Sequence, residues 1–172
     1  MNLSPEASVK GSVSVGPWLT IAALLALADQ ALKWLVQDLM PYGQSIPLTS
    51  FFNWVHVWNT GAAFSLLADA GGWQRYFFIV LALTVSVALI LMLRKPLPRL
   101  EAMGYSLILG GAVGNVADRI IRGYVVDYLD FHWYDWHWPA FNLADVGICL
   151  GAVLLLVTTF RDARSTKVST SR

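Results

Sequence analysis

Residues 76–93 read YFFIVLALTVSVALILML, an apolar run in which no side chain carries a charge. A helix needs about 20 mostly apolar residues to cross the hydrocarbon core of a bilayer, so this run predicts a transmembrane helix. Three further stretches of the chain are almost free of charged residues. Together the four stretches predict membrane spans over residues 17–36, 75–93, 101–118 and 140–160. The sequence is thus typical of an all-α polytopic membrane protein, a four-transmembrane-helix bundle formed as a single domain by residues 1–172.

The composition of the whole chain supports this interpretation and excludes other classes of protein. Hydrophobic residues make up 56% of the 172 residues and charged residues only 13%, against roughly 25% charged in an average soluble domain. A disordered chain would show the opposite balance, and a formal net charge of +1 gives no reason to expect a nucleic-acid partner. The single cysteine, Cys149, excludes an internal disulfide and metal sites built on cysteine pairs, so we expect neither a metal nor a cofactor.

The distribution of basic residues predicts how the bundle is oriented. With four spans, both termini lie on one side of the membrane, together with the short loop at residues 94–100. Lys and Arg outnumber Asp and Glu by eight to three on that side, whereas acidic residues outnumber basic ones by six to three on the other. Because basic loops stay in the cytoplasm, we expect both termini to be cytoplasmic. Seven of the eight tryptophans fall near the outer face, where the headgroup region favours them.

Between the first two spans, residues 48–66 read PLTSFFNWVHVWNTGAAFS. Aromatic and β-branched residues are frequent here, and turn residues flank them. We therefore expect a small extracytoplasmic strand region at about residues 44–66. The polar ends of the chain, residues 1–15 and 161–172, are predicted to be disordered.

Two pairs of glycines, each four residues apart, predict close helix packing. Gly110-x-x-x-Gly114 lies in the third span and Gly147-x-x-x-Gly151 in the fourth. Small residues at this spacing let the backbones of two membrane helices approach closely. We expect the third and fourth spans to be neighbours.

Few ionisable residues fall within the predicted spans, where each costs about 2.5–3.5 kcal/mol on insertion scales. Asp29 and Lys33 lie four residues apart on the first span, which places them on one helix face. We favour mutual neutralisation of these two charges over a direct role in chemistry. At the end of the third span, Asn115, Asp118 and Arg119 share one stripe of the helix. An ion pair at the membrane surface explains this stripe as well as a functional site does.

Asp127 and Asp145 are the two aspartates whose positions are hardest to explain. Asp127 lies among apolar and aromatic residues near the outer interface, where the simplest interpretation is a loop aspartate. Asp145 lies about one turn inside the apolar fourth span, and Asn142 could cap that helix. Capping does not explain why an aspartate stands inside an apolar helix. Two carboxyl groups near one edge also suit general acid–base catalysis with water, one ionised and the other protonated.

Five motifs, in this order along the chain, closely resemble those of the bacterial lipoprotein signal peptidases, also called type II signal peptidases. They are Asp29-Gln30-x-x-Lys33, Asn59-Thr60-Gly61-Ala62-Ala63-Phe64, Gly114-Asn115-x-x-Asp118-Arg119, Val125-Val126-Asp127-Tyr128 and Phe141-Asn142-Leu143-Ala144-Asp145. Each motif is modest alone, but five in register on four spans are highly specific. The resemblance extends from about residue 17 to residue 160.

The resemblance implies an aspartic endopeptidase of the bacterial cytoplasmic (inner) membrane, which cuts prolipoproteins just before a diacylglyceryl-modified cysteine. It implies that Asp127 and Asp145 form a catalytic dyad at the outer face. It further implies a small β-platform outside the membrane, a mobile loop or helix over the site, and inhibition by the cyclic peptide globomycin. We expect a monomer in contact with membrane lipid. Supporting roles are implied for Asn59, Gly61, Asn115, Asp118, Arg119, Asn142, Asp29 and Lys33.

Two other functions use some of the same residues. A small ion- or proton-coupled membrane transporter could use Asp29, Asp118 and Asp145, because carboxylates inside membranes often carry protons. An assembly factor could use the glycine faces of the third and fourth spans without any chemistry. Neither the G-x-S-x-G nor the H-E-x-x-H motif occurs in the chain, which argues against serine and zinc hydrolases.

Overall fold

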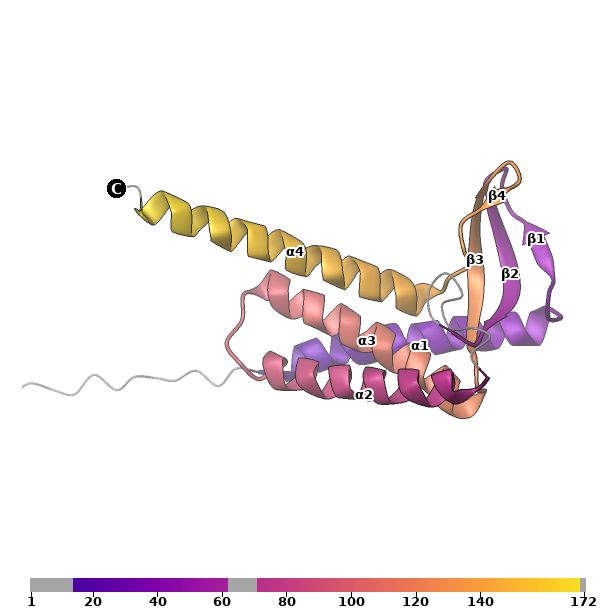
Figure 1. The fold of residues 1–172 in the computed structure, drawn as a ribbon, viewed down its shortest axis with the longest axis horizontal. Coiled ribbons are helices and arrows are strands. Elements are labelled where there is room, and N and C mark those ends of the chain that lie inside the picture. Colours follow the sequence, from indigo (N-terminus) through magenta and orange to yellow (C-terminus); the bar gives the residue numbers. More distant parts are fainter. Residues whose placement is uncertain (1–13, 62–70, 171–172) are drawn as a thin grey trace, which may run out of the picture.

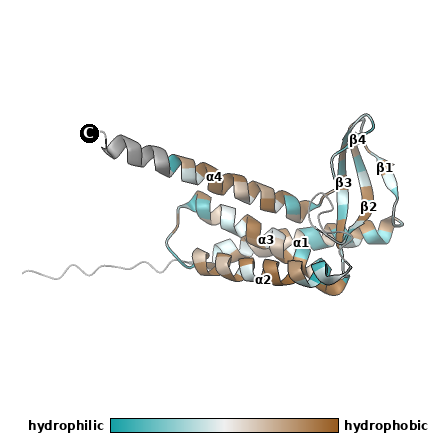
Figure 2. Cartoon of the chain, viewed as in Figure 1, coloured by the Kyte–Doolittle hydropathy of each residue, from teal (hydrophilic) through white to brown (hydrophobic). Residues whose placement is uncertain are grey.

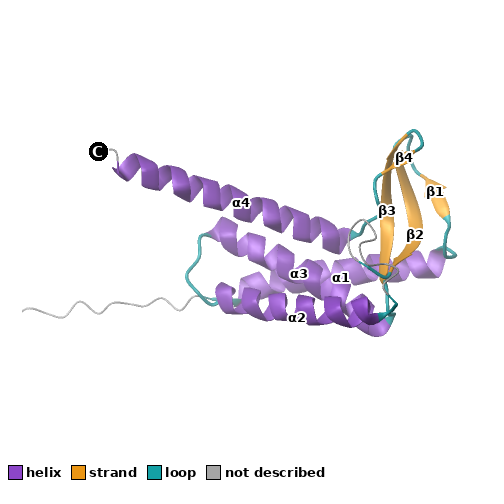
Figure 3. Cartoon of the chain, viewed as in Figure 1, coloured by secondary structure: helices purple, strands orange, loops and turns teal. Residues whose placement is uncertain are grey.

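The computed structural model describes residues 14–61 and 71–170, with side chains up to residue 161. In this part of the chain, four helices form a bundle and a four-stranded antiparallel sheet stands at one end of it (Figures 1 and 3). The helices are α1 (Gly16–Leu39), α2 (Trp73–Leu93), α3 (Arg99–Ile121) and α4 (Leu143–Thr170), and the strands are β1 (Ser45–Pro47), β2 (Phe52–Asn59), β3 (Val125–Trp133) and β4 (Trp136–His137).

The central helix of the bundle is α3, because α1, α2 and α4 each pack against it. Of the described helices, α1, α2 and α4 up to Arg161 are long and apolar enough to cross a membrane. Figure 2 shows hydrophobic residues along much of their lengths. Three of the four predicted spans are thus confirmed in length and composition. The remaining predicted span, residues 101–118, lies in α3. This helix is less apolar because it faces protein rather than lipid, and its 23 residues extend over about 35 Å.

Glycines bring α3 and α4 into close contact, as predicted, but they are not the predicted pair on α3. A Cβ atom on Gly111 would lie 2.3 Å from the carbonyl oxygen of Ala144 in α4, and Gly104, seven residues earlier, also faces α4. Gly110 instead packs against the backbone of α1, and Gly114 lies against both α1 and α4. The two backbones of α3 and α4 therefore approach as closely as a missing side chain allows.

The sheet has the strand order β1-β2-β3-β4, and every neighbouring pair is antiparallel. Val57 of β2 lies opposite Asp127 of β3, after an irregularity in register between Trp54 and Val57. The predicted strand region at residues 44–66 therefore contains β1 and β2, and its last residues, 62–66, lie outside the described part of the chain. An apolar cluster that includes Val36 of α1 and Val126 of β3 joins the sheet to the helices.

Two features of the structure differ from the sequence-based expectations. Residues 125–133 form the strand β3, although the sequence predicts an outer loop there. The strand is hard to recognise because its first four residues are all buried, so apolar and polar residues do not alternate. At the other end of the chain, α4 continues to Thr170 instead of ending near residue 160 in a disordered tail. No glycine or proline follows Gly151 to end this helix.

Candidate active site

The first turn of α4 is capped by its own polar residues. The side-chain oxygen of Asn142 accepts a hydrogen bond from the backbone N–H of Asp145 at 3.0 Å. In return, Asp145 Oδ2 accepts one from the backbone N–H of Asn142 at 3.2 Å. This reciprocal pair has the form of a capping box. The capping role that the sequence suggests for Asn142 is therefore confirmed, and it also fixes where the Asp145 side chain lies.

Two residues from other elements complete this helix terminus. The hydroxyl of Tyr128, on β3, accepts a hydrogen bond from the backbone N–H of Leu143 at 3.0 Å. Asp29 Oδ1, on α1, accepts one from the backbone N–H of Ala144 at 3.0 Å. The N–H groups at a helix start have no partner within the helix. Here side chains from three elements satisfy them, and this anchors Asp145 to both α1 and the sheet.

Asp127 lies on β3, only 3% exposed, and both of its carboxyl oxygens accept hydrogen bonds. Asn142 Nδ2 donates to Oδ1 at 2.6 Å, and Asn59 Nδ2 donates to Oδ2 at 3.1 Å. Burial first, and then the nearby charge of Asp145, raise the pKa of Asp127 to about 7. The two asparagine hydrogen bonds only partly oppose this shift. The carboxyl group therefore exchanges its proton near neutral pH.

Asp145 also has both carboxyl oxygens occupied. Asn115 Nδ2, on α3, donates to Oδ1 at 2.8 Å, and the backbone of Asn142 donates to Oδ2. Asn142 thus contacts both aspartates, with its side-chain amide on Asp127 and its backbone N–H on Asp145. The two carboxyl groups come from different elements but share one partner.

Three asparagines surround the two carboxyl groups, and each is held at its amide oxygen by a group that can only donate. Asn59 Oδ1 accepts from the backbone N–H of Gly61 at 3.0 Å. Asn142 Oδ1 accepts from the backbone N–H of Asp145, and Asn115 Oδ1 accepts from the ammonium of Lys33 at 2.9 Å. With the oxygen held in this way, each NH₂ group must point at a carboxylate. The polar environment of both aspartates is therefore preorganised.

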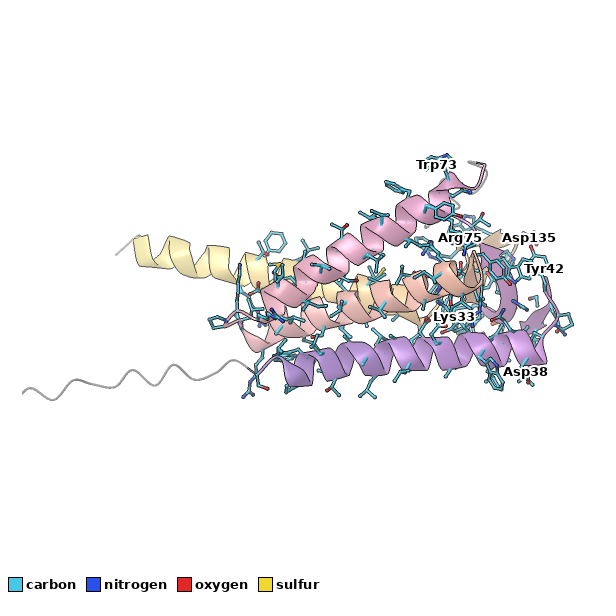
Figure 4. The ribbon with its side chains drawn as sticks, turned by 90° about the horizontal axis from the view of Figure 1, so that it is seen from below. Lys33, Asp38, Tyr42, Trp73, Arg75 and Asp135 are labelled. Atoms are coloured by element: carbon cyan, nitrogen blue, oxygen red, sulfur yellow. The ribbon has the colours of Figure 1, made fainter. Side chains whose placement is uncertain are left out.

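Lys33 lies in a fully buried charge cluster at the sheet end of the bundle (Figure 4). Its Nζ lies 2.7 Å from Asp29 Oδ2 and 2.8 Å from Asp118 Oδ2, and all three side chains are 0% exposed. The neutralisation that the sequence suggests for Asp29 and Lys33 is confirmed, and Asp118 joins the pair. Buried charges of this kind persist only when each has its partners.

Asp118 connects this charge cluster to β3. Its Oδ2 accepts a hydrogen bond from the backbone N–H of Val126 at 3.2 Å, one residue before Asp127. Its Oδ1 accepts from Gln30 at 2.7 Å and from Arg122 at 2.5 Å. Gln30 belongs to the first of the five motifs but was given no role, and Arg122 is a neighbour of the site that the sequence does not single out. The spacing of four between Asp118 and Arg122 is a signal that could have found the second.

Arg119 links α3 to the end of β2. Its Nη2 donates to the carbonyl oxygen of Gly61 at 2.6 Å, and its guanidinium lies 5.0 Å from the ring centre of Phe78 on α2. Arg75, near the start of α2, donates to the carbonyl oxygens of Arg119 at 2.7 Å and Ile120 at 3.0 Å. Figure 4 shows Arg75 at the same end of the bundle as Lys33. Arg75 was not predicted, because its partners are backbone atoms far along the chain.

The structure places all ten residues that the sequence predicts for the site in one connected network, beginning with Asp127 and Asp145. Ala62, Ala63 and Phe64, which belong to one of the five motifs, lie outside the described residues. Among the residues that are described, no cluster of His, Cys, Asp or Glu could hold a metal ion. The ten are Asp127, Asp145, Asn59, Gly61, Asn115, Asp118, Arg119, Asn142, Asp29 and Lys33.

A pocket of about 860 Å³ lies on the sheet beyond these residues, with Phe131, Trp133 and Trp136 among its lining. Phe131 and Trp133 follow Asp127 at every second position of β3, so they lie on the same face of the strand. Phe141, which precedes Asn142, also lines the pocket and stacks with Phe131 at 5.9 Å. An aromatic surface therefore leads away from the two carboxyl groups.

Comparisons with known proteins show which proteins this chain is similar to. A family model described as signal peptidase (SPase) II matches residues 21–161. A lipoprotein signal peptidase of Serratia marcescens is 62% identical over 138 residues, covering 80% of this chain and 81% of the relative. One from Janthinobacterium sp. (strain Marseille) is 51% identical over 151 residues, covering 87% and 92%. A bacterial membrane enzyme solved by the in meso method at 2.3 Å resolution has a TM-score of 0.79 and 27% identity, with 88% and 92% covered.

Proposed function

Because this chain belongs to the signal peptidase II family, a family of aspartic peptidases, we propose that Asp127 and Asp145 are its catalytic dyad. Membership makes the chain a membrane enzyme that removes signal peptides from prolipoproteins. We further propose that it cleaves its substrate just before a diacylglyceryl-modified cysteine. One observation supports the dyad above all others: a buried carboxyl group on β3 and a half-buried one on α4 share Asn142 as a hydrogen-bond partner.

The proposed mechanism assigns different roles to the two carboxyl groups. Asp127, with a pKa raised to about 7, keeps a proton and donates it in a hydrogen bond to the carbonyl oxygen of the scissile peptide. Asp145 is ionised and takes a proton from the attacking water as the water oxygen bonds to the carbonyl carbon. The resulting oxyanion receives the proton of Asp127. When the C–N bond breaks, the proton held by Asp145 passes to the leaving amine and the oxyanion returns its proton to Asp127.

The position of the site suits a substrate that stays in the bilayer. All the polar residues of the network lie at the sheet end of the helices, where Trp133 and Trp136 are 72% and 62% exposed. Exposed tryptophans favour the headgroup region, so this end lies at the membrane surface. In the proposal this is the outer surface of the inner membrane, α3 also crosses the membrane, and the chain works as a monomer. The enzyme then reaches the bond beside a lipid-modified cysteine without extracting the lipid.

The transporter alternative is less well supported. A proton path needs titratable groups distributed across the membrane. Instead, Asp29, Asp118 and Asp145 join one network at a single end of the bundle. A role as an assembly factor would not explain why these polar residues form a network.

The dyad is tested by purifying Asp127→Asn and Asp145→Asn in detergent and assaying a lipidated precursor. Each variant should lose activity by at least about 10³-fold, since removing one member of a catalytic unit removes its chemistry. Full activity in either variant would contradict the assignment. Globomycin should inhibit cleavage of the precursor by the parent protein. An unlipidated precursor serves as the control for lipid recognition and should be cleaved poorly.

Orientation is tested separately with cysteine labelling, because the chain has one cysteine to remove. Cys149→Ser is combined either with Asp135→Cys, in the β3–β4 turn, or with Lys95→Cys, between α2 and α3. In intact spheroplasts, an impermeant maleimide should label only the cysteine at position 135. The opposite pattern would reverse the proposed orientation.

A further inference from the structure

Lys33 reaches the proposed dyad through a single side chain, Asn115. We propose that Lys33 is a positioning residue for catalysis, because its ammonium sets the orientation of the Asn115 amide that donates to Asp145. This inference rests on the proposed function and deepens it. It adds a specific task to a residue whose charge could otherwise be explained by ion pairing alone.

An asparagine amide can occupy the same space in two orientations that exchange its oxygen and its nitrogen. In one orientation, Asn115 Nδ2 donates to Asp145 Oδ1 at 2.8 Å. In the other, the amide oxygen would face the carboxylate and repel it. An ammonium group contains donors only, so Lys33 binds the oxygen of Asn115, at 2.9 Å, and excludes the second orientation.

The structure also shows why a side chain has to perform this task. Asn59 and Asn142 receive the equivalent hydrogen bond from backbone N–H groups in a turn and at a helix start. Asn115 lies inside α3, where backbone N–H groups are already used along the helix. A donor for its amide oxygen must therefore come from another element, and α1 supplies Lys33.

Charge balance alone does not require the contact with Asn115. Lys33 has three N–H donors; its contacts with Asp29 and Asp118, together with the ion pair of Arg122 and Asp118, balance the two carboxylates. The third donor is directed at Asn115. Because all of these side chains except Asn115 are 0% exposed, the ammonium has no water to replace any partner.

A double-mutant cycle separates positioning from support of the fold. The reference is Asp29→Asn, which keeps an oxygen for the Ala144 N–H. In this background Lys33 can be replaced by a neutral residue because the remaining charges, Asp118 and Arg122, still balance. Lys33→Met, Asn115→Leu and their combination are made in this background. For each protein, kcat and KM for a lipidated precursor are measured in detergent, together with the thermal unfolding midpoint.

We expect Lys33→Met to lower kcat about tenfold or more with KM changed less than about threefold, the usual effect of losing a hydrogen bond to a charged group. Asn115→Leu should lower kcat at least as much. In the Asn115→Leu background, Lys33→Met should lower kcat by less than about twofold, since the two residues act in series. Equal losses from Lys33→Met in both backgrounds, or no loss in the first, would overturn the proposal.

Two further variants keep the result decisive. If Lys33→Met does not fold, Lys33→Leu removes the donor with a different apolar side chain, and the same comparison of backgrounds applies. Asp127→Asn is assayed beside the cycle. If it remains active, the proposed dyad is wrong; if it is inactive while the cycle is additive, only the role of Lys33 is wrong.

Discussion

The carboxylate of Asp29 accepts a hydrogen bond from the backbone N–H of Ala144 at 3.0 Å, and so ties α1 to the first turn of α4. The same carboxylate lies 2.7 Å from the ammonium of Lys33. Asp29 therefore supports the site in two ways: it anchors the residue before Asp145, and it holds the cation that contacts Asn115.

Replacing Asp29 by alanine or by asparagine should separate these two contributions. Asp29→Ala removes both and leaves a buried N–H unpaired, so we expect the free energy of unfolding to fall by about 3–5 kcal/mol. Asp29→Asn keeps an acceptor for Ala144 but turns an NH₂ group toward Lys33, which keeps Asp118, so its loss should be smaller, about 1–3 kcal/mol. Thermal and denaturant unfolding in detergent would measure the difference. Equal losses would show that the hydrogen bond to Ala144 contributes little.

Asn142 combines a cap for α4 with a donor to Asp127, and serine can replace only the first of these. Asn142→Ser should still cap the helix, because serine and asparagine are similar N-cap residues, and stability should change by less than about 1 kcal/mol. Activity on a lipidated precursor should nevertheless fall about 10- to 100-fold, since the donor to Asp127 is lost. Asn142→Ala is the matched control, in which stability and activity fall together. Unchanged activity in Asn142→Ser would leave only the capping role.

Stability should decrease as pH rises from about 4 to about 7. The pKa of Asp127 is about 7 in the folded protein, against an ordinary value of 3.8. Between these values, the folded state holds a proton that the unfolded state has lost, so raising the pH favours unfolding. The Asp127 contribution amounts to about 4 kcal/mol over this range and is constant above it.

Unfolding of the parent and of Asp127→Asn should be followed at a series of pH values. The parent should show the decrease, and the variant, which cannot titrate at this position, should show a flatter profile. Activity of the parent should also decline above about pH 7, as Asp127 loses the proton that it donates in the proposed mechanism. A variant profile parallel to that of the parent would place the titration on another group.

Local sequence patterns predict some of the site well. The spacing of Asn142 and Asp145 indicates a helix start, and the spacing of Asp29 and Lys33 indicates an ion pair, because both relationships lie within one or two turns of a helix. The charge-free runs locate α1, α2 and α4 to within a few residues, except for the far end of α4.

Other parts depend on contacts between distant elements, which spacing cannot show. The first four residues of β3 are buried on both faces, so the alternation by which a strand is recognised is absent there. Arg75 and Arg122 donate hydrogen bonds to residues 44 to 92 positions away in the sequence, except for the contact of Arg122 with Asp118. The orientation of the Asn115 amide is set by Lys33, 82 residues earlier. These relationships exist only once the helices have packed.

The close approach of α3 and α4 leads to a last prediction, which concerns Gly111. A methyl group at this position would lie 2.3 Å from the carbonyl oxygen of Ala144 and 2.7 Å from Ile148 Cγ1. The carbonyl belongs to the first turn of α4 and cannot rotate away as a side chain could. Gly111→Ala should therefore displace that turn, lower the free energy of unfolding by about 1–3 kcal/mol and reduce activity with it.

Gly16→Ala is the matched control, because it makes the same change in the helix α1 at a place with room. A methyl group on Gly16 would meet its nearest neighbour, Ser14 Oγ, at an ordinary 3.7 Å. Its stability and activity should equal those of the parent or exceed them slightly, since alanine favours helix more than glycine does. Unfolding midpoints and initial rates on a lipidated precursor would be compared for the three proteins. If Gly111→Ala behaves like Gly16→Ala, α4 can shift without disturbing Asp145, and the contact between the two helices does not hold the carboxyl group in place.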